Sequence, residues 1–144
     1  PKTVDLDFET RDATKSVADR MNLRLGDKVI YMRRLRLADG VPMMLERTYV
    51  PLSHFLGFTK KDLEGKSLYA IIENDYHETI RVAEEEFFAT VARKDDAEVL
   101  GISEGAPVLQ LSRVTYNDKN DVIEFTHSVA RADQFKYKIS HVRS

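Results

Sequence analysis

The chain of 144 residues contains no cysteine, which excludes disulfide bridges and thiolate-ligated metal sites and is compatible with a cytoplasmic protein. No apolar run approaches the roughly 18–20 residues that a helix needs to cross a bilayer, and no secretory signal opens the sequence. Glycine and proline number only six and four, and they form no linker or low-complexity segment. We therefore expect residues 1–144 to form one cytoplasmic domain without a membrane partner.

A strong charge of one sign is also lacking, since the formal net charge is −2. The apolar fraction of 42% and the charged fraction of 32% are typical of a globular protein. Without a basic field, this segment is not expected to bind DNA directly. The chain has no initiator methionine, and strand-like alternation begins already at Val4, which predicts a fragment of a longer protein.

Motifs of catalysis are missing as well. The four histidines His54, His77, His127 and His141 do not have the spacing of metal ligands. No G-x-S-x-G elbow, P-loop or dinucleotide-binding G-x-G-x-x-G occurs. The sequence therefore predicts no catalytic residue, no metal site and no cofactor.

What the sequence does contain is an internal repeat, whose two copies are 79 positions apart, as Gly26 and Gly105 are. The first copy runs through Ala18, Met21, Leu23, Gly26, Val29, Met32, Arg34, Leu35 and Asp39. Its counterparts are Ala97, Leu100, Ile102, Gly105, Val108, Leu111, Arg113, Val114 and Asp118. Each copy predicts a short helix, a glycine turn, a strand, a tight turn and a returning strand. Two such hairpins predict one antiparallel sheet with pseudo-symmetry and a pocket where the copies meet.

Periodicity and turn residues refine this outline into an α+β fold with an antiparallel sheet flanked by helices. Asp12-Ala13-Thr14 is expected to cap a helix that runs through about Met21, and further helices are expected at residues 68–75 and 95–100, with a loop of short helical turns at 52–66. Asp39-Gly40 is a hairpin turn signal. Strands are expected at residues 4–8, 28–38, 42–50, 79–92, 107–116, 122–130 and 134–139, although 79–92 also fits a helix.

Arg34 and Arg36 lie two residues apart in one predicted strand, so they point to the same face about 7 Å apart. That face is otherwise apolar, with Ile30 and Met32, and two guanidinium groups there are costly without anionic partners. Each guanidinium can grip a phosphate or carboxylate with two hydrogen bonds. The alternatives are salt bridges to Glu46 or Glu124, or exposure to solvent at a strand end.

Ser67-Leu68-Tyr69 supplies a second signal for an anion, because serine is a preferred N-cap and a helix N-terminus offers free N–H groups. Ser67 can equally well serve only to cap the helix. Glu46 and Glu124 lie on the two returning strands, where they can accept hydrogen bonds from a ligand or simply neutralise an arginine.

The ordered string of these segments resembles a known family. Its pieces are Arg34-Leu35-Arg36-Leu37-Ala38-Asp39-Gly40-Val41-Pro42, Glu46, Tyr49-Val50-Pro51, Ser67-Leu68-Tyr69, Val122-Ile123-Glu124 and Arg131-Ala132-Asp133. Over nearly the whole chain, this string is similar to the UTRA effector-binding domain of HutC-type GntR transcription regulators. The resemblance implies the fold of chorismate lyase, which is an antiparallel sheet flanked by helices.

The resemblance also implies a bacterial regulator of this family, a homodimer whose winged helix-turn-helix domain precedes this segment and alone contacts operator DNA. In the family, effectors are small metabolites, often anionic, with sugar phosphates prominent. The effector-binding residues then correspond to Arg34, Arg36, Glu46, Ser67, Leu68, Tyr69 and Glu124.

Two rival interpretations stay open at this point. A small lyase of the same fold could hold a carboxylate product on Arg34 and Arg36, with Glu124 as acid or base. A dimerisation domain without a ligand would instead pair both arginines with Glu46 and Glu124 and leave no cavity between them.

Overall fold

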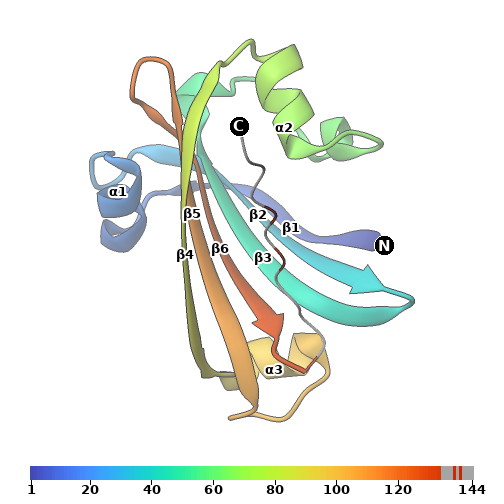
Figure 1. Ribbon diagram of the computed structural model, residues 1–144. Helices are drawn as coiled ribbons and strands as arrows, with labels where there is room; N and C mark the ends of the chain where they lie inside the picture. Colours follow the sequence, from blue (N-terminus) through green and yellow to red (C-terminus); the bar gives the residue numbers. More distant parts are fainter. Residues whose placement is uncertain (134–137, 139, 141–144) are drawn as a thin grey trace.

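The computed structural model describes residues 1–133, 138 and 140, and it shows a six-stranded antiparallel sheet with helices on both faces (Figure 1). The helices are α1 (Lys15–Met21), α2 (Leu68–Ala70), which continues into the π-helical turn η3 (Ile71–Asp75), and α3 (Lys94–Leu100), with 3₁₀ turns η1 (Leu52–His54) and η2 (Lys60–Leu63). The strands are β1 (Lys2–Asp12), β2 (Lys28–Ala38), β3 (Val41–Pro51), β4 (Ile80–Val91), β5 (Pro107–Asn117) and β6 (Val122–Arg131). The predicted α+β class is confirmed.

Most predicted elements match the structure to within a residue or two. The ambiguous segment 79–92 is the strand β4, because it pairs with β5 along its length. β1 is longer than the predicted residues 4–8, because it continues through the polar, exposed residues 9–12, where no apolar alternation indicates a strand. The hairpin turn at Asp39 and Gly40 is confirmed, with φ of 51° and 76°. The predicted last strand, 134–139, lies outside the described residues except for residue 138.

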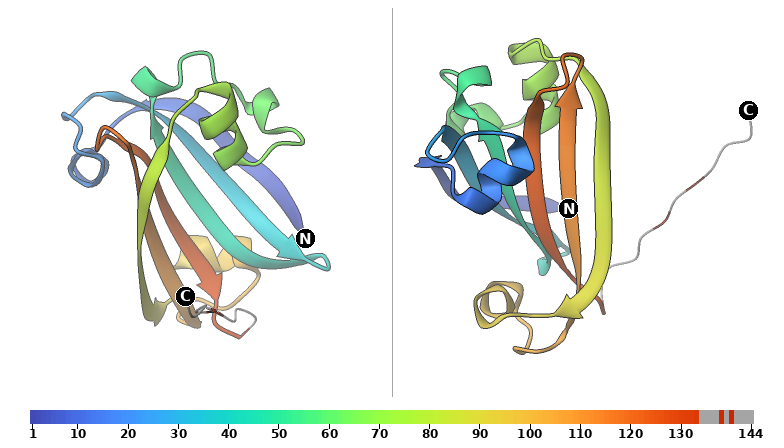
Figure 2. Two further views of the ribbon diagram at one scale, coloured as in Figure 1. Left: turned by 45° about the horizontal axis from the view of Figure 1, so that its top comes forward. Right: turned by 90° about the vertical axis from the view of Figure 1, so that its left-hand side faces the viewer.

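The internal repeat extends to the whole sheet. α3 and β5 begin 79 residues after α1 and β2 and have the same lengths, seven and eleven residues. The strand order β1-β2-β3-β6-β5-β4 therefore consists of two three-stranded halves that meet edge to edge (Figure 2). At this seam between β3 and β6, Arg47 lies opposite His127. A pseudo-twofold axis consequently passes through the centre of the sheet.

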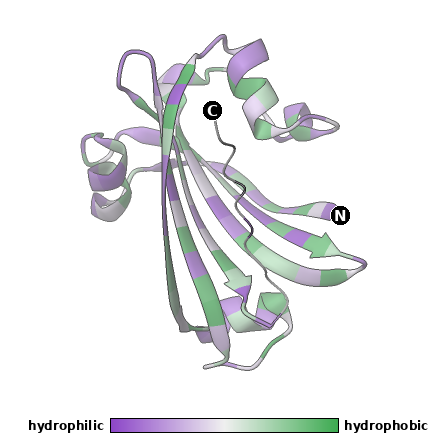
Figure 3. Cartoon of the chain, in the orientation of Figure 1, coloured by the Kyte–Doolittle hydropathy of each residue, from purple (hydrophilic) through white to green (hydrophobic). Residues whose placement is uncertain are grey.

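Apolar and polar residues alternate along the strands, as the banding in Figure 3 shows, and apolar clusters lie on both faces of the sheet. On one face, the segment from η1 to η3 covers Ile30, Met32 and Ile123. On the other face, α1 packs over the start of β2 and on Phe125 of β6. α3 packs in the same way over the start of β5 and on Leu45 of β3. The two repeat helices thus cover opposite ends of one face.

The face covered by α2 changes character along the strands. Beyond its apolar cluster, the central strands turn buried polar side chains toward α2 instead of apolar ones. These side chains are Arg34, Glu46, Thr48, Thr115, Glu124, Thr126 and Ser128. Burial of so many polar groups is costly unless each has a partner, so this region is the first candidate for a functional site.

Candidate functional site

A hollow of about 370 Å³ opens between the start of α2 and this polar part of the sheet. Its size lies within the range of small-molecule sites. The residues that line it come from β1, β2, β5 and the segment 63–69: Thr3, Asp5, Arg34, Arg36, Leu63, Lys66, Ser67, Leu68, Tyr69 and Arg113. Five of the seven predicted site residues, from β2 and from the start of α2, therefore border one hollow on one face of the sheet.

Arg34 is the buried cation of this hollow, with only 8% of its surface exposed. Its Nε is, among the described residues, the one buried side-chain nitrogen or oxygen that lacks a hydrogen-bond partner. Burial lowers the pKa of Arg34, and the neighbouring charge of Arg36 lowers it further, while Glu46 acts in the opposite direction. A buried donor without an acceptor costs about 1–3 kcal/mol. The position therefore favours a ligand that brings a negative charge or an acceptor.

Glu46 does not border the hollow; it lies behind Arg36. The Nε of Arg36 donates to the Glu46 carboxylate, which is almost completely buried, while the Arg36 side chain is 49% exposed. The alternative that Glu46 neutralises an arginine thus holds for Arg36. Arg34 lies directly across the strand pair from Glu46 but forms no ion pair with it.

Glu124 is completely buried and accepts hydrogen bonds from both hairpin strands and from α2. Its carboxylate accepts from Arg113 Nη2 at 2.7 Å and from the Tyr69 hydroxyl at 3.1 Å. The hydroxyls of Thr115 and Thr126 donate to it at 2.7 and 2.6 Å. Burial alone would raise the pKa of Glu124, but Arg113 and the threonine hydroxyls outweigh it, so this pKa lies below its usual value. Glu124 is therefore an ionised anchor and not a free acid or base.

Arg113 is the site residue that the sequence-based prediction omitted. Its guanidinium lies 5.3 Å from the centre of the Tyr69 ring and borders the hollow. It occupies the position in the second half that Arg34 occupies in the first, and the offset of 79 residues was the signal that could have identified it. Lys66 also lines the hollow and pairs with Asp75 at 3.1 Å.

Ser67 is an N-cap, as predicted, since its hydroxyl accepts a hydrogen bond from the Ala70 N–H at 3.1 Å. Its place in the hollow is observed, while a contact between Ser67 and a ligand stays a prediction. In the described part of the chain, no group of three histidine, aspartate or glutamate side chains could hold a metal ion. None of the helices among those residues is long and apolar enough to cross a membrane.

Comparisons with known proteins agree with this architecture. The family model for the UTRA domain matches residues 1–136. The HTH-type transcriptional repressor NagR of Bacillus subtilis (strain 168) is 29% identical over 132 residues, which is 92% of this chain and 54% of NagR. MngR of Escherichia coli (strain K12), named as the mannosyl-D-glycerate transport/metabolism system repressor, is 26% identical over 92% of this chain and 55% of its own. The chain thus spans about half the length of these curated relatives.

A solved structure from Bordetella bronchiseptica, described as the ligand-binding domain of a regulator assigned to the GntR family, superimposes with a TM-score of 0.89. Its sequence is 25% identical, and the match covers 98% of this chain and 90% of the other. The named relatives are transcriptional repressors and regulators, in agreement with the expectation that the chain is not an enzyme. With a family model that matches nearly its whole length, the chain belongs to the UTRA domain family of GntR-type transcription regulators.

Proposed function

We propose that this domain senses a small anionic metabolite, a sugar phosphate or a related sugar acid, in the hollow beneath α2. The buried Nε of Arg34, which has no partner, carries the proposal. Hydrogen bonds from a guanidinium to a charged acceptor are among the strongest in proteins and are often formed in pairs. An anion against Arg34 would satisfy this donor and offset the cost of burying the cation.

The charges around the hollow support an anion. Four basic side chains line it, against a single carboxylate, Asp5. The carboxylates of Glu46 and Glu124 lie behind Arg36 and Arg113, so they orient these guanidinium groups without lining the hollow themselves. The guanidinium groups therefore border the space in which the ligand would lie.

The remaining lining residues support a sugar as the rest of the ligand. Asp5 and Thr3 on β1 offer oxygen atoms that can bind hydroxyl groups. Leu63 and Leu68 add apolar surface that can contact the C–H groups of a sugar ring. MngR, one of the relatives, is named for a system that handles mannosyl-D-glycerate, a sugar acid.

We further infer that a winged helix-turn-helix domain precedes this segment in the complete protein and contacts the operator. NagR, which is about twice as long as its match to this chain, is named as an HTH-type repressor. A ligand can alter DNA binding only if it binds one arrangement of the regulator more tightly than another. In this proposal, the hollow under α2 supplies that difference in affinity.

Arg34→Gln is expected to weaken binding of the cognate anion by about 10–150-fold, which corresponds to the loss of about 1.5–3 kcal/mol for hydrogen bonds to a charged group. Isothermal titration calorimetry with a panel of sugar phosphates and sugar acids measures this effect. Arg33→Gln is the matched control, because Arg33 is the preceding residue, lies on the opposite face of the sheet and pairs with Asp7 at 2.6 Å. Equal affinities of the two variants for the cognate anion would refute the site.

We also propose that the domain forms a homodimer through the edge strand β4. Phe88 and Val91 are 50% and 60% exposed on this strand, which pairs only with β5 among the described residues. Phe88→Lys is expected to weaken self-association by about 10–150-fold, since burial of a phenylalanine side chain contributes about 1.5–3 kcal/mol. Sedimentation velocity over a range of concentrations measures it, with Val41→Lys at the distant β2–β3 turn as control. A chain that is monomeric at every concentration would contradict the proposal.

A further inference from the structure

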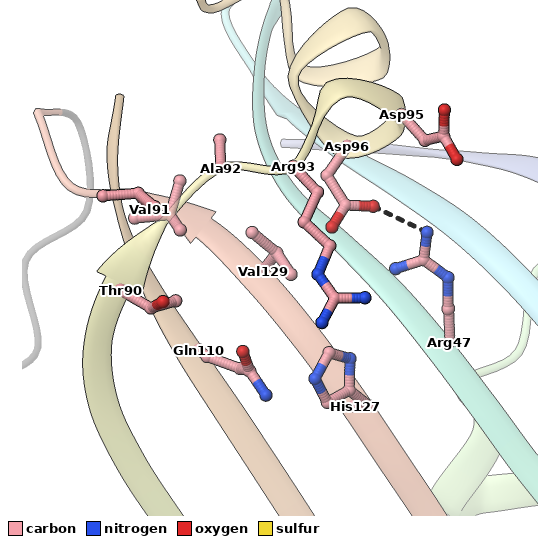
Figure 4. Close-up of a pocket in the computed structure, with 11 residues that line it drawn as sticks. Arg47, Thr90, Val91, Ala92, Arg93, Asp95, Asp96, Gln110, His127 and Val129 are labelled. Carbon is pink, nitrogen blue, oxygen red and sulfur yellow. Dashed lines mark hydrogen bonds and ion pairs between the residues drawn. The ribbon is translucent and has the colours of Figure 1, made fainter. Parts of the chain in front are cut away.

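A second hollow, of about 410 Å³, lies on the opposite face of the sheet, under the start of α3 (Figure 4). Its lining includes Arg47, Arg93, Asp96, Gln110, His127 and Val129. Arg47 and His127 follow Glu46 and Thr126 in sequence, so their side chains point away from the first hollow. The two hollows therefore lie on opposite faces of the sheet, and β5 contributes lining residues to both, Arg113 to the first and Gln110 to the second.

The internal repeat shows how this space arises. In the first half, the equivalent region is filled by stacked rings: Tyr31 and Tyr49 have centroids 5.0 Å apart, and Tyr49 and Phe125 5.8 Å apart. The guanidinium of Arg11 covers Tyr31 at 3.8 Å. This end of the sheet is thus packed with large side chains.

In the second half, each of these positions carries a smaller side chain. The pair Tyr31–Tyr49 of β2 and β3 corresponds to Gln110–Val129 of β5 and β6. By the same registers, Phe125 corresponds to Leu45 and Arg11 to Thr90. The absence of three aromatic rings accounts for the hollow. The first half shows how the same region looks when large side chains fill it.

The second half has also gained polar groups around this space. Asp96, the third residue of α3, stands where α1 has the apolar Val17. Asp96 accepts a hydrogen bond from Arg47 Nη2 at 2.6 Å, which neutralises both groups. A hollow with apolar walls, such as Val108 and Val129 provide here, and a few converging polar side chains is typical of a binding site.

Arg93 supplies the charge that has no partner. Figure 4 shows its side chain extending into the hollow toward His127, while the Asp95 carboxylate points away. The Arg93 side chain forms no hydrogen bond or ion pair with any described residue. Burial lowers the pKa of His127, and the charge of Arg47 lowers it further, so its ring is neutral at pH 7 and can either donate or accept. The Gln110 amide offers a further donor and acceptor.

We propose that this hollow is a second binding site, distinct from the one beneath α2, for a small molecule with a single anionic group. Arg93 grips a carboxylate or phosphate, while His127 and Gln110 form hydrogen bonds to the rest of the molecule. The site requires no contribution from Arg34, so the proposal stands independently of the effector site.

Nuclear magnetic resonance of the 144-residue chain, titrated separately with sodium acetate and sodium phosphate, tests this proposal. The His127 ring and Gln110 side-chain amide signals are expected to shift and saturate, with a midpoint on the order of 1–10 mM for such small probes. Stronger binding of acetate would identify a carboxylate site and stronger binding of phosphate a phosphate site. Sodium chloride at equal ionic strength is the control for screening.

Two matched variants separate the hollows. Arg93→Gln, an exposed substitution that leaves the fold intact, is expected to raise the midpoint at His127 and Gln110 at least about tenfold. Arg34→Gln is expected to leave this midpoint within about twofold, because it lies on the other face of the sheet. Gln110→Tyr, which restores the ring of the first half, is expected to abolish the His127 shift. Shifts that chloride reproduces, that fail to saturate, or that persist unchanged in Arg93→Gln would overturn the second site.

Discussion

Glu124→Gln is expected to lower the free energy of unfolding by about 3–5 kcal/mol, because it leaves Arg113 without its counter-charge in a buried setting. The carboxylate is completely buried and accepts from Arg113, Tyr69, Thr115 and Thr126. An amide of the same shape would turn an N–H group toward donors, so packing stays the same while at least one contact becomes repulsive. Few single substitutions on the surface approach this size.

Chemical denaturation with urea measures this loss. Glu85→Gln is the matched control, because Glu85 of β4 lies across from Arg113 of β5 but is exposed. This control is expected to change the free energy of unfolding by less than about 0.5 kcal/mol. The double variant with Arg113→Gln is expected to lose less than the sum of the two single variants. A loss for Glu124→Gln no greater than that of the control would show that this network does not stabilise the fold.

The same residue links stability to pH. The folded-state pKa of Glu124 lies below the ordinary value of 4.5, so the unfolded chain binds a proton before the folded chain does. The stabilisation by Glu124 is therefore complete above about pH 4.5 and declines as the pH falls through the folded-state pKa. The difference in stability between the unmodified chain and Glu124→Gln should accordingly be constant near neutral pH and narrow in acid.

Arg34→Met is expected to act in the opposite direction, raising the free energy of unfolding by about 1–3 kcal/mol while removing affinity for the anion. The substitution removes a buried cation whose Nε has no partner. Its neighbour Met32 on the same face is completely buried in the apolar cluster, so a methionine extends an existing apolar surface. Glu46 keeps Arg36 as its partner.

Thermal and urea unfolding in the absence of ligand measure this gain, and calorimetry with the cognate anion measures the loss of binding. Arg33→Met is the control, since it removes a partly exposed arginine that has a partner, Asp7; no gain is expected there. If Arg34→Met were destabilised as strongly as Glu124→Gln, Arg34 would have to be a structural residue and not one retained for a ligand. A variant Arg34→Met that is more stable but binds the anion more weakly would show that this buried charge is retained for function.

The sequence allowed much of this fold to be predicted, because the two repeat copies and the strand alternation are both local patterns. The bounds predicted for the strand Lys28–Ala38 are the observed ones, and the two-residue period of its side chains correctly placed Arg34 and Arg36 on one face. The full length of β1 was not predicted, since residues 9–12 are polar and exposed and carry no apolar alternation from which a strand is recognised. Local pattern therefore predicted most elements but not this polar extension.

The ion-pair partners of the charged residues were harder to predict, because they depend on strand register and on bulges. Glu124 was assigned either to a ligand or to Arg34 and Arg36, yet the pairing of β5 with β6 places it against Arg113. The second hollow was also missed, since it depends on differences in side-chain size between two distant copies. Comparison of Tyr31 with Gln110 alone would not have shown it without the register of the neighbouring strands.

The seam between β3 and β6 has a consequence for the order in which the chain acquires its structure. Within each half, strands adjacent in sequence pair with one another, across α1 or α3 and across tight turns. The seam instead joins distant positions such as Arg47 and His127, and closing so long a loop costs entropy before any contact forms. Long-range pairing of this kind is slow, so we expect the two halves to form early and their docking to limit the rate of folding.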